Sequence, residues 1–215
     1  TENSFYFMEN NLGFDLDAAD NAISPLAMGG LTYGVTTEEM AAAFAAFANG
    51  GIYTEPRTII EIRENDNETV MVDNSSNSKV AMKETTAYLM TNMLYRAVNE
   101  YGGTGGGARF SGMHIAGKTG TTNDNYDRYF TGYTPYYCAA VWVGYAKNER
   151  ISYSVNPAAS LWRQVMEKVH ADLPDKSFSK PSSGLTTVIG CADSGMRVTD
   201  ACLADPRGSR AVVYE

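Results

Sequence analysis

The sequence contains no apolar run long enough to cross a membrane. A transmembrane helix needs about 20 consecutive apolar residues, and no segment of the 215-residue chain reaches that length. Residues 1–4 (TENS) also lack the positively charged start of a signal peptide. We therefore expect any membrane anchor of the protein to lie outside this chain.

Positive charge is also scarce. The chain has 17 lysine and arginine residues against 25 aspartate and glutamate residues, which gives a net charge of −8. Proteins that bind nucleic acid cluster positive charge to neutralise phosphates, so this composition disfavours a nucleic-acid partner. The hydrophobic share of 44% and the charged share of 20% are those of a globular protein that buries a core.

Cysteine and histidine are few. Three cysteines do not make a disulfide framework; Cys191 and Cys202 could pair in an oxidising compartment, and unpaired thiols are the alternative. The two histidines, His114 and His170, have no cysteine or carboxylate at ligand spacing, so we expect no metal and no cofactor. His170 falls in the last turn of a predicted helix, where a cationic side chain suits the helix dipole.

Hydrophobic spacing predicts three main helices. In the first, Thr36 and Glu39 have the spacing of a capping box, and residues 40–48 are apolar on nearly every side, as in a buried helix. The second covers residues 83–101, and the third opens at Pro157. We expect each of these two to bury one stripe, made of Ala87, Met90, Leu94, Ala97 and Tyr101 in the second and of Ala158, Leu161, Trp162, Val165, Met166 and Val169 in the third.

The remaining patterned segments are predicted to be strands. Residues 58–63 and 69–73 flank a polar stretch, as the two arms of a hairpin do. Three closely spaced strand-like segments indicate an antiparallel meander: 113–122, 129–134 and 136–146, the last of them rich in aromatic and β-branched residues. Trp142 and Trp162 are expected to be core contacts between this sheet and the third helix.

These elements predict an α+β fold in which helices cover an antiparallel sheet. Residues 1–172 hold all of the strongly patterned segments. Beyond them, prolines and a Ser-Ser-Gly run precede a weakly patterned remainder. We therefore expect a main domain over residues 1–172, and a linker with a small tail unit over residues 173–215.

Two glycine motifs match nucleotide-binding patterns. Residues 112–119 (GMHIAGKT) fit the phosphate-loop pattern, which would indicate a nucleoside triphosphatase. That loop needs a buried strand before it and a helix that starts at the lysine, and neither is predicted here, so it remains a remote alternative. Residues 103–108 fit G-x-G-x-x-[GA] but follow a helix, so a flexible loop beside a functional strand is the better interpretation.

The motif that suits its neighbours is Lys118-Thr119-Gly120-Thr121 on a predicted strand. It matches the K-T-G pattern of penicillin-recognising serine acyltransferases. Because side chains alternate along a strand, Lys118 and Gly120 share one face, and Thr119 and Thr121 share the other. A cation with hydroxyls nearby suits a ligand that carries a carboxylate, because charge-assisted hydrogen bonds to it are strong.

The sequence resembles the transpeptidase domain of class A penicillin-binding proteins over residues 13–170. Besides K-T-G, the matching blocks keep the family's order and spacing: 24–30 (SPLAMGG), 34–44 (GVTTEEMAAAF), 47–51 (FANGG), Asp127, 130–135 (FTGYTP) and 141–145 (VWVGY). Tyr129 stands where family members commonly carry tryptophan, which bears on fine substrate preference. The tail is similar to a short extension of some Gram-positive members through Cys191, Ser194, Gly195 and Cys202.

The resemblance implies a penicillin-binding transpeptidase or β-lactamase-like fold and a role for each motif residue. Thr119 and Thr121 would hold the terminal carboxylate of a D-alanyl-D-alanine stem peptide or of a β-lactam. Lys118 would supply positive potential and help a serine relay protons, and Gly120 would leave room for the nucleophile's helix. On an edge strand, the peptide could add to the sheet, and the Thr121 amide would donate to the oxyanion.

The nucleophile that this chemistry requires is not found at the family's position. The full pattern places S-x-x-K and then S-x-N before K-T-G. Ser76-Asn77-Ser78-Lys79 and Ser75-Ser76-Asn77 overlap in one polar loop, and the matches at 154–156 and 177–180 come after K-T-G. We therefore expect a truncated fold whose nucleophile helix and first strands lie upstream, and a fragment that is inactive alone.

The predicted function is that of a peptidoglycan D,D-transpeptidase that works through a serine acyl-enzyme. The resemblance implies an extracytoplasmic protein with a glycosyltransferase domain and one membrane anchor upstream. Two alternatives stay open: a D,D-carboxypeptidase or β-lactamase that passes the acyl group to water, and a non-catalytic penicillin-recognition sensor.

Overall fold

The computed structural model describes residues 1–66, 68–75 and 77–214. The chain forms two compact units, residues 1–179 and 180–215, which are treated separately below. Asn67, in the turn of the predicted hairpin, and Ser76, in one of the S-x-x-K matches, lie outside the described residues.

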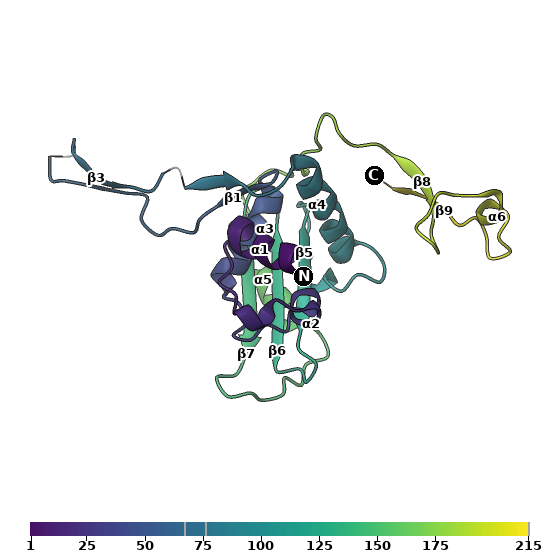
Figure 1. Ribbon diagram of the computed structural model, residues 1–215, viewed down its shortest axis with the longest axis horizontal. Coiled ribbons are helices and arrows are strands. Elements are labelled where there is room, and N and C mark those ends of the chain that lie inside the picture. The colour runs from purple at the N-terminus through teal and green to yellow at the C-terminus, as the bar shows by residue number, and fades with distance from the viewer. Residues whose placement is uncertain (67, 76, 215) are drawn as a thin grey trace. The chain divides into compact units, whose positions relative to one another are not determined.

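A three-stranded antiparallel sheet forms the centre of the first unit (Figure 1). Its strands are β5 (Ala116–Thr121), β6 (Asp127–Tyr133) and β7 (Cys138–Gly144), in the order β5-β6-β7. The register pairs Gly117 with Gly132. The Phe130 ring lies where a Cβ of either glycine would be, with Cζ 2.7 Å from that of Gly117 and Cε1 2.7 Å from that of Gly132. The predicted meander is confirmed, with shorter strands.

Helices α3 (Thr37–Ala48) and α4 (Glu84–Asn99) cover one face of the sheet. The predicted capping box is present, because Thr36 Oγ1 accepts from the Glu39 amide while the Glu39 carboxylate accepts from the Thr36 amide. On this face Tyr133 packs edge-on against Phe44, and its hydroxyl lies 2.8 Å from Thr91 Oγ1.

Helix α5 (Pro157–Val169) covers the opposite face. Its N-cap, Asn156, accepts from the amides of Ala158 and Ala159. Trp162 is fully buried, packs edge-on against Phe130 and donates Nε1 to the Ala139 carbonyl at 3.0 Å. The predicted placement of α5 on the sheet is therefore confirmed.

Three predictions about burial are wrong. Trp142 is 45% exposed, because it lies on the face of β7 opposite Trp162 and donates to Asp127 Oδ1 at 2.9 Å. In α5 the buried residues are Ala158, Ala159, Trp162 and Met166, while Leu161, Val165 and Val169 are about half exposed. In α4 the buried stripe is Ala87, Thr91, Leu94 and Val98, and Tyr101 is fully exposed. In both helices the buried stripe is rotated from the predicted one, although Ala87, Leu94, Ala158, Trp162 and Met166 are buried as predicted.

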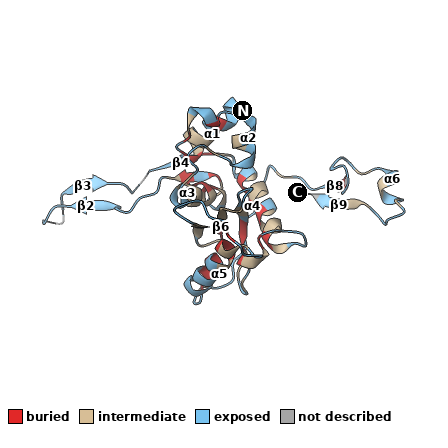
Figure 2. Ribbon diagram, turned by 90° about the horizontal axis from the view of Figure 1, so that it is seen from below, coloured by how far each residue is buried: buried red, intermediate tan, exposed pale blue. Residues whose placement is uncertain are grey.

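The N-terminal part forms a second core with α3. It comprises α1 (Glu2–Leu12), the short helices η1 (Ala18–Asp20) and α2 (Ile23–Met28), and β1 (Ile52–Thr54), which pairs with β4 (Ser78–Val80). Between β1 and β4 the chain forms the predicted hairpin, with β2 (Glu61–Arg63) antiparallel to β3 (Val70–Asp73). Both strands are exposed throughout (Figure 2). Among the described helices, none has the length and apolarity needed to cross a membrane.

The second unit contains little regular structure. Strands β8 (Val188–Cys191) and β9 (Ala211–Tyr214) form an antiparallel pair, and the four-residue helix α6 (Asp200–Leu203) lies between them in sequence.

Candidate functional site

The K-T-G residues lie on β5, at the end of the sheet. Among the described strands, β5 pairs with β6 alone, so its other edge is not paired with a strand. Lys118 and Thr121 are exposed, and Thr119 and Gly120 are half-buried. The phosphate-loop alternative is wrong, because residues 116–121 form a strand where that motif requires the start of a helix.

The sheet register assigns each motif residue to a face. Lys118 pairs with Thr131 and Gly120 pairs with Tyr129, and residues opposite one another in an antiparallel pair share a face. This face is the one covered by α3 and α4. Thr119 pairs with Phe130 and therefore shares the face covered by α5. This register confirms that the motif side chains divide between the two faces of the sheet as predicted.

Lys118 has no charged partner among the described residues. Lys118 Nζ donates to the carbonyl of Thr119 at 3.0 Å, and the described residues place neither a carboxylate nor a serine hydroxyl in hydrogen-bond contact with it. Lys118 is therefore an exposed basic side chain on a strand whose outer edge no described strand pairs with.

The glycine-rich segment after α4 reaches the motif through a hydroxyl that the sequence did not single out. Thr104 Oγ1 lies 2.7 Å from Thr119 Oγ1. The segment folds back on the end of α4, with the Gly105 amide donating to the Ala97 carbonyl at 2.9 Å. A Cβ at Gly103 would lie 2.4 Å from that carbonyl, so the close approach requires glycine there. The only sequence signal for this contact is a threonine placed between glycines, in the segment that precedes β5.

Two buried hydroxyls on the Lys118 face of β6 have no hydrogen-bond partner among the described residues. They are Tyr129 OH and Thr131 Oγ1. Burial, and secondarily the charge of Glu39, raises the pKa of Tyr129 to about 12. Tyr129 also lines a cavity of about 790 Å³ between β6 and residues 29–37. The sheet thus presents unsatisfied polar groups and open volume on the face that carries the lysine.

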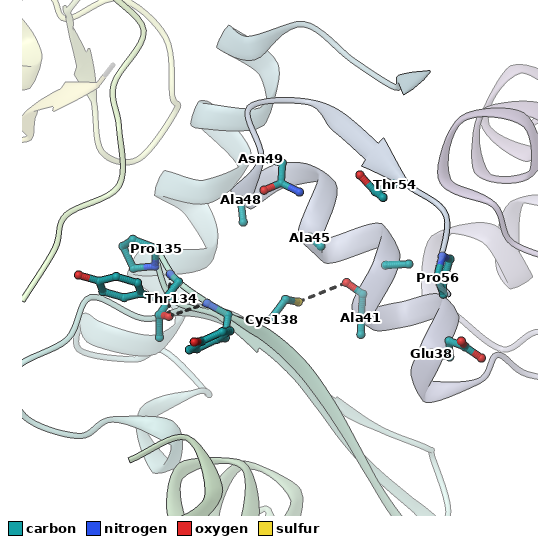
Figure 3. Close-up of a pocket in the computed structure, with 13 residues that line it drawn as sticks. Glu38, Ala41, Ala45, Ala48, Asn49, Thr54, Pro56, Thr134, Pro135 and Cys138 are labelled. Atoms are coloured by element: carbon teal, nitrogen blue, oxygen red, sulfur yellow. Dashed lines mark hydrogen bonds between the residues drawn. The ribbon is translucent and has the colours of Figure 1, made fainter. Parts of the chain in front are cut away.

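A different cavity lies between α3 and the turn that joins β6 to β7 (Figure 3). Its volume is about 410 Å³, and none of the predicted site residues lines it. Cys138 points across it and donates Sγ to the Ala41 carbonyl at 3.3 Å. Burial raises the pKa of the Cys138 thiol to about 12, so this thiol is a poor nucleophile at neutral pH.

The two histidines make packing and hydrogen-bond contacts within the fold. His114 stacks on Tyr95, with ring centroids 5.7 Å apart, and so lies beside α4. His170 is at the end of α5 as predicted, but it is only 5% exposed. Its Nδ1 lies 2.7 Å from the Met166 carbonyl and its Nε2 lies 2.8 Å from Thr134 Oγ1, so it ties the end of α5 to the end of β6. In the described part of the chain no group of three or more side chains could hold a metal ion.

The S-x-N match at residues 154–156 and the S-x-x-K match at residues 177–180 make no hydrogen bond to the K-T-G lysine in the described part of the chain. In Ser154-Val155-Asn156, the asparagine caps α5 and donates Nδ2 to the Tyr129 carbonyl at 3.1 Å. Ser177 lies 3.4 Å from His114 Nε2. Neither residue is hydrogen-bonded to Lys118 in the part of the chain that the structure describes.

Known proteins match the chain over most of its length. The family model "Penicillin binding protein transpeptidase domain" matches residues 7–167. Penicillin-binding protein 1A of Clostridium botulinum is 36% identical over 200 residues, which are 92% of this chain and 24% of that protein. Penicillin-binding protein 1A/1B of Bacillus subtilis is 38% identical over 193 residues, covering 81% of this chain and 21% of that protein. The chain therefore spans about a quarter of the length of these curated relatives.

A solved structure agrees at the level of the fold. The penicillin-binding protein PonA1 of Mycobacterium tuberculosis has a TM-score of 0.67 with this structure at 22% identity, over 82% of this chain and 51% of that chain. Together with the matched family model and the identities above 30%, this shows that the chain belongs to the family of penicillin-binding protein transpeptidase domains.

Proposed function

We propose that this chain supplies the K-T-G wall of a peptidoglycan D,D-transpeptidase, a serine-type acyltransferase that cross-links stem peptides. The observation that carries the proposal is the position of residues 118–121 at an open edge of the sheet, inside the segment that matches the transpeptidase family. Residues 1–172 would belong to the transpeptidase portion, and residues 173–215 would form a linker and a tail unit.

Each motif residue has a proposed role in acyl transfer. The hydroxyls of Thr119 and Thr121 bind the terminal carboxylate of the D-alanyl-D-alanine stem peptide. Lys118 attracts that carboxylate and helps move the proton of a serine nucleophile. The Thr121 amide donates to the oxyanion of the tetrahedral intermediate, where the loss of one donor typically raises the barrier by about 3 kcal/mol. Gly120 keeps the lysine face clear for the nucleophile's helix.

The open edge of β5 supports the recognition of an extended peptide. A peptide that adds to this edge hydrogen-bonds the backbone of residues 118–121 and lays its side chains alternately on the two faces of the sheet. The same geometry suits a β-lactam, which carries a carboxylate near its reactive amide. A relative of the same fold, PonA1, has been solved in complex with penicillin V, which favours β-lactams as ligands here.

The remaining domains of the complete protein and its cellular location are also proposals. The relatives are much longer than this chain. On the resemblance to class A members, we propose that the complete protein carries a glycosyltransferase domain and one membrane anchor upstream. Acyl transfer to peptidoglycan takes place outside the cytoplasmic membrane, and we therefore propose an extracytoplasmic location.

The test is covalent labelling of the complete product of the gene by a fluorescent penicillin. Lys118→Ala should lower the second-order rate of labelling by about 100-fold or more, because both carboxylate attraction and proton transfer are lost. Lys147→Ala, which removes another exposed lysine, should leave the rate unchanged. Equal labelling of the wild type and the Lys118→Ala variant would refute the proposed role of the lysine.

The products separate the transpeptidase from its alternatives. A transpeptidase passes the acyl group of a D-alanyl-D-alanine donor to an added amine, such as a D-amino acid. A carboxypeptidase or β-lactamase releases only the hydrolysed acid. A sensor module forms no exchanged product, and the complete gene would lack the serine of S-x-x-K.

A further inference from the structure

The second unit, residues 180–215, has almost no hydrophobic core. Its regular structure is one pair of four-residue strands and one four-residue helix. Most of its large apolar side chains are exposed: Val188, Ile189, Met196, Leu203, Val212 and Val213. A two-stranded sheet is marginally stable by itself, and units below about 40 residues usually need a disulfide, a metal ion or a partner to stay folded.

The residues at the centre of this unit are its two cysteines. Cys191 ends β8 opposite Ala211 of β9, and it is only 6% exposed. The Arg210 amide, next to Ala211, donates to the Cys202 carbonyl at 2.8 Å. This bond holds α6 at the end of the strand pair, and it brings the Cys202 thiol within hydrogen-bond reach of the Cys191 thiol.

Cys191 also lies among hydrogen-bond donors that favour its thiolate. The turn after β8 directs the backbone amides of Ser194 and Asp193 at Cys191 Sγ, and the Ser194 hydroxyl and the Cys202 thiol add to them. These hydrogen bonds lower the pKa of the Cys191 thiol to about 7, so a large fraction is thiolate at neutral pH. Cys138, in the other unit, has a pKa raised to about 12 and provides an internal contrast.

Other means of stabilising this unit are weak or missing. Asp193 accepts from Arg207 at 2.6 Å and from Arg210 at 2.7 Å, but all three side chains are substantially exposed, and exposed ion pairs contribute little. No cluster of three or more metal-binding side chains occurs among the described residues. A bond between Cys191 and Cys202 is the one strong cross-link that the described residues of this unit could form.

We propose that Cys191 and Cys202 form a disulfide that fastens α6 to the end of the β8–β9 pair. The oxidant is a disulfide-bonded compound R–S–S–R, such as oxidised glutathione or a disulfide oxidoreductase. The Cys191 thiolate attacks one sulfur and releases RS⁻, which gives a mixed disulfide. The Cys202 thiolate then attacks Cys191 Sγ, closes the bridge and releases a second RS⁻. The two cysteines lose two electrons and two protons, and R–S–S–R is reduced to two thiols.

Peptide mapping tests the bridge directly. Arg197 lies between the two cysteines, so trypsin separates them into different peptides unless a disulfide joins them. After incubation of the whole chain with oxidised glutathione and alkylation of the remaining thiols, we expect one linked species with the summed mass of both peptides less two hydrogen atoms. Reduction before digestion should convert it to two alkylated peptides. Cys138 should be alkylated only after unfolding.

Three outcomes would overturn the proposal, two of them seen by peptide mapping. One is alkylation of both Cys191 and Cys202 after oxidation, and the other is a glutathione adduct on each cysteine without a linked species. A linked species that appears only between two chains, as shown by a dimer on a non-reducing gel, would equally overturn it.

Limited proteolysis tests the effect on folding without a substitution. Trypsin should cleave after Arg197 at least about tenfold more slowly in the oxidised wild type than in the reduced wild type, because the bridge closes the loop that contains this site. Cys191→Ser and Cys202→Ser should each abolish the difference between the oxidised and reduced forms. Cys138→Ser should preserve it. Equal cleavage of the oxidised and reduced wild type would refute the proposed stabilisation.

Discussion

Thr104 Oγ1 lies 2.7 Å from Thr119 Oγ1, which joins the glycine-rich segment after α4 to the middle of the K-T-G strand. In the proposed function the Thr119 hydroxyl donates to a carboxylate, which requires one rotamer, and the hydrogen bond to Thr104 restricts the rotation of the Thr119 side chain. The glycine-rich segment is therefore part of the candidate site, although its sequence resembles an ordinary linker.

Thr104→Ala should weaken acylation without unfolding the protein. The variant removes the hydroxyl that restrains Thr119, so we expect the labelling rate of the complete protein by fluorescent penicillin to fall about three- to tenfold. The free energy of unfolding should change by less than about 1 kcal/mol, because this hydrogen bond lies at the surface and water can replace it. Thr54→Ala is the matched control, since it breaks the exposed Thr54–Ser78 hydroxyl pair far along the chain from β5. Equal labelling rates in the wild type and the Thr104→Ala variant would contradict the positioning role.

Gly117→Ala should destabilise the central sheet. A Cβ at Gly117 would lie 2.7 Å from the Thr131 carbonyl oxygen and 2.7 Å from Phe130 Cζ. Because one of these atoms belongs to the backbone, the strands must shift, and we expect a loss of about 1–3 kcal/mol in the free energy of unfolding. Gly30→Ala is the control, since a Cβ there meets nothing within 4 Å. Chemical denaturation monitored by circular dichroism measures both variants, and similar values for the two would count against the tight packing.

Two tyrosines on the same face of β6 should respond oppositely to the loss of a hydroxyl. Tyr133→Phe breaks the buried hydrogen bond to Thr91 and should cost about 1–2 kcal/mol in the free energy of unfolding. Tyr129→Phe removes a buried hydroxyl that has no hydrogen-bond partner among the described residues. This second change should leave the stability unchanged or raise it. A larger loss from Tyr129→Phe than from Tyr133→Phe would show that the Tyr129 hydroxyl is satisfied in solution.

Asp20 should make the stability of the N-terminal core depend on pH. Its carboxylate accepts from the Thr32 hydroxyl at 2.7 Å and from the Thr32 amide at 2.8 Å. The hydrogen bond from the Thr32 hydroxyl, first among the causes, lowers the pKa of Asp20 below its ordinary value of 3.8. The ionised form is therefore favoured by folding, so its contribution is fully present above pH 3.8 and is lost as the pH falls through the lower folded-state pKa.

The experiment compares the melting temperatures of the wild type and Asp20→Asn as a function of pH. The difference between them should be constant at neutral pH and should shrink below about pH 4. Thr32→Val, which deletes the donating hydroxyl, should move this shrinkage to higher pH. A difference that grows as the solution is acidified would contradict the sign of the shift.

The central sheet and its covering helices could be predicted because local sequence patterns specify them. Each signal involves residues close together in the chain. These signals are the Thr36–Glu39 capping box, Pro157 at the start of α5 and the closely spaced strand-like segments. The K-T-G residues were likewise predicted on a strand, and the register of β5 with β6 confirms their division between the two faces.

The sequence was a poorer guide to which apolar side chains are buried. Trp142 and Trp162 are alike in the sequence, but they lie on opposite sides of the sheet: Trp162 is enclosed between α5 and the sheet, and Trp142 is 45% exposed. Helical periodicity indicates a stripe to within about one residue, and the packing against β6 and β7 then decides that Ala159 is buried while Val165 is not.

The sequence by itself determined the family, the strand that carries Lys118 and the order of the three main helices and the central strands, because these depend on residue types at fixed spacing. Only the tertiary structure decided that Thr104 contacts Thr119, and that the hydroxyls of Tyr129 and Thr131 find no hydrogen-bond partner among the described residues. It also decided that Cys191 and Cys202 meet at one end of a strand pair. Such relationships depend on how the chain folds back on itself. Non-local contacts of this kind are selected by the close packing of the whole unit, and no short segment contains the information that specifies them.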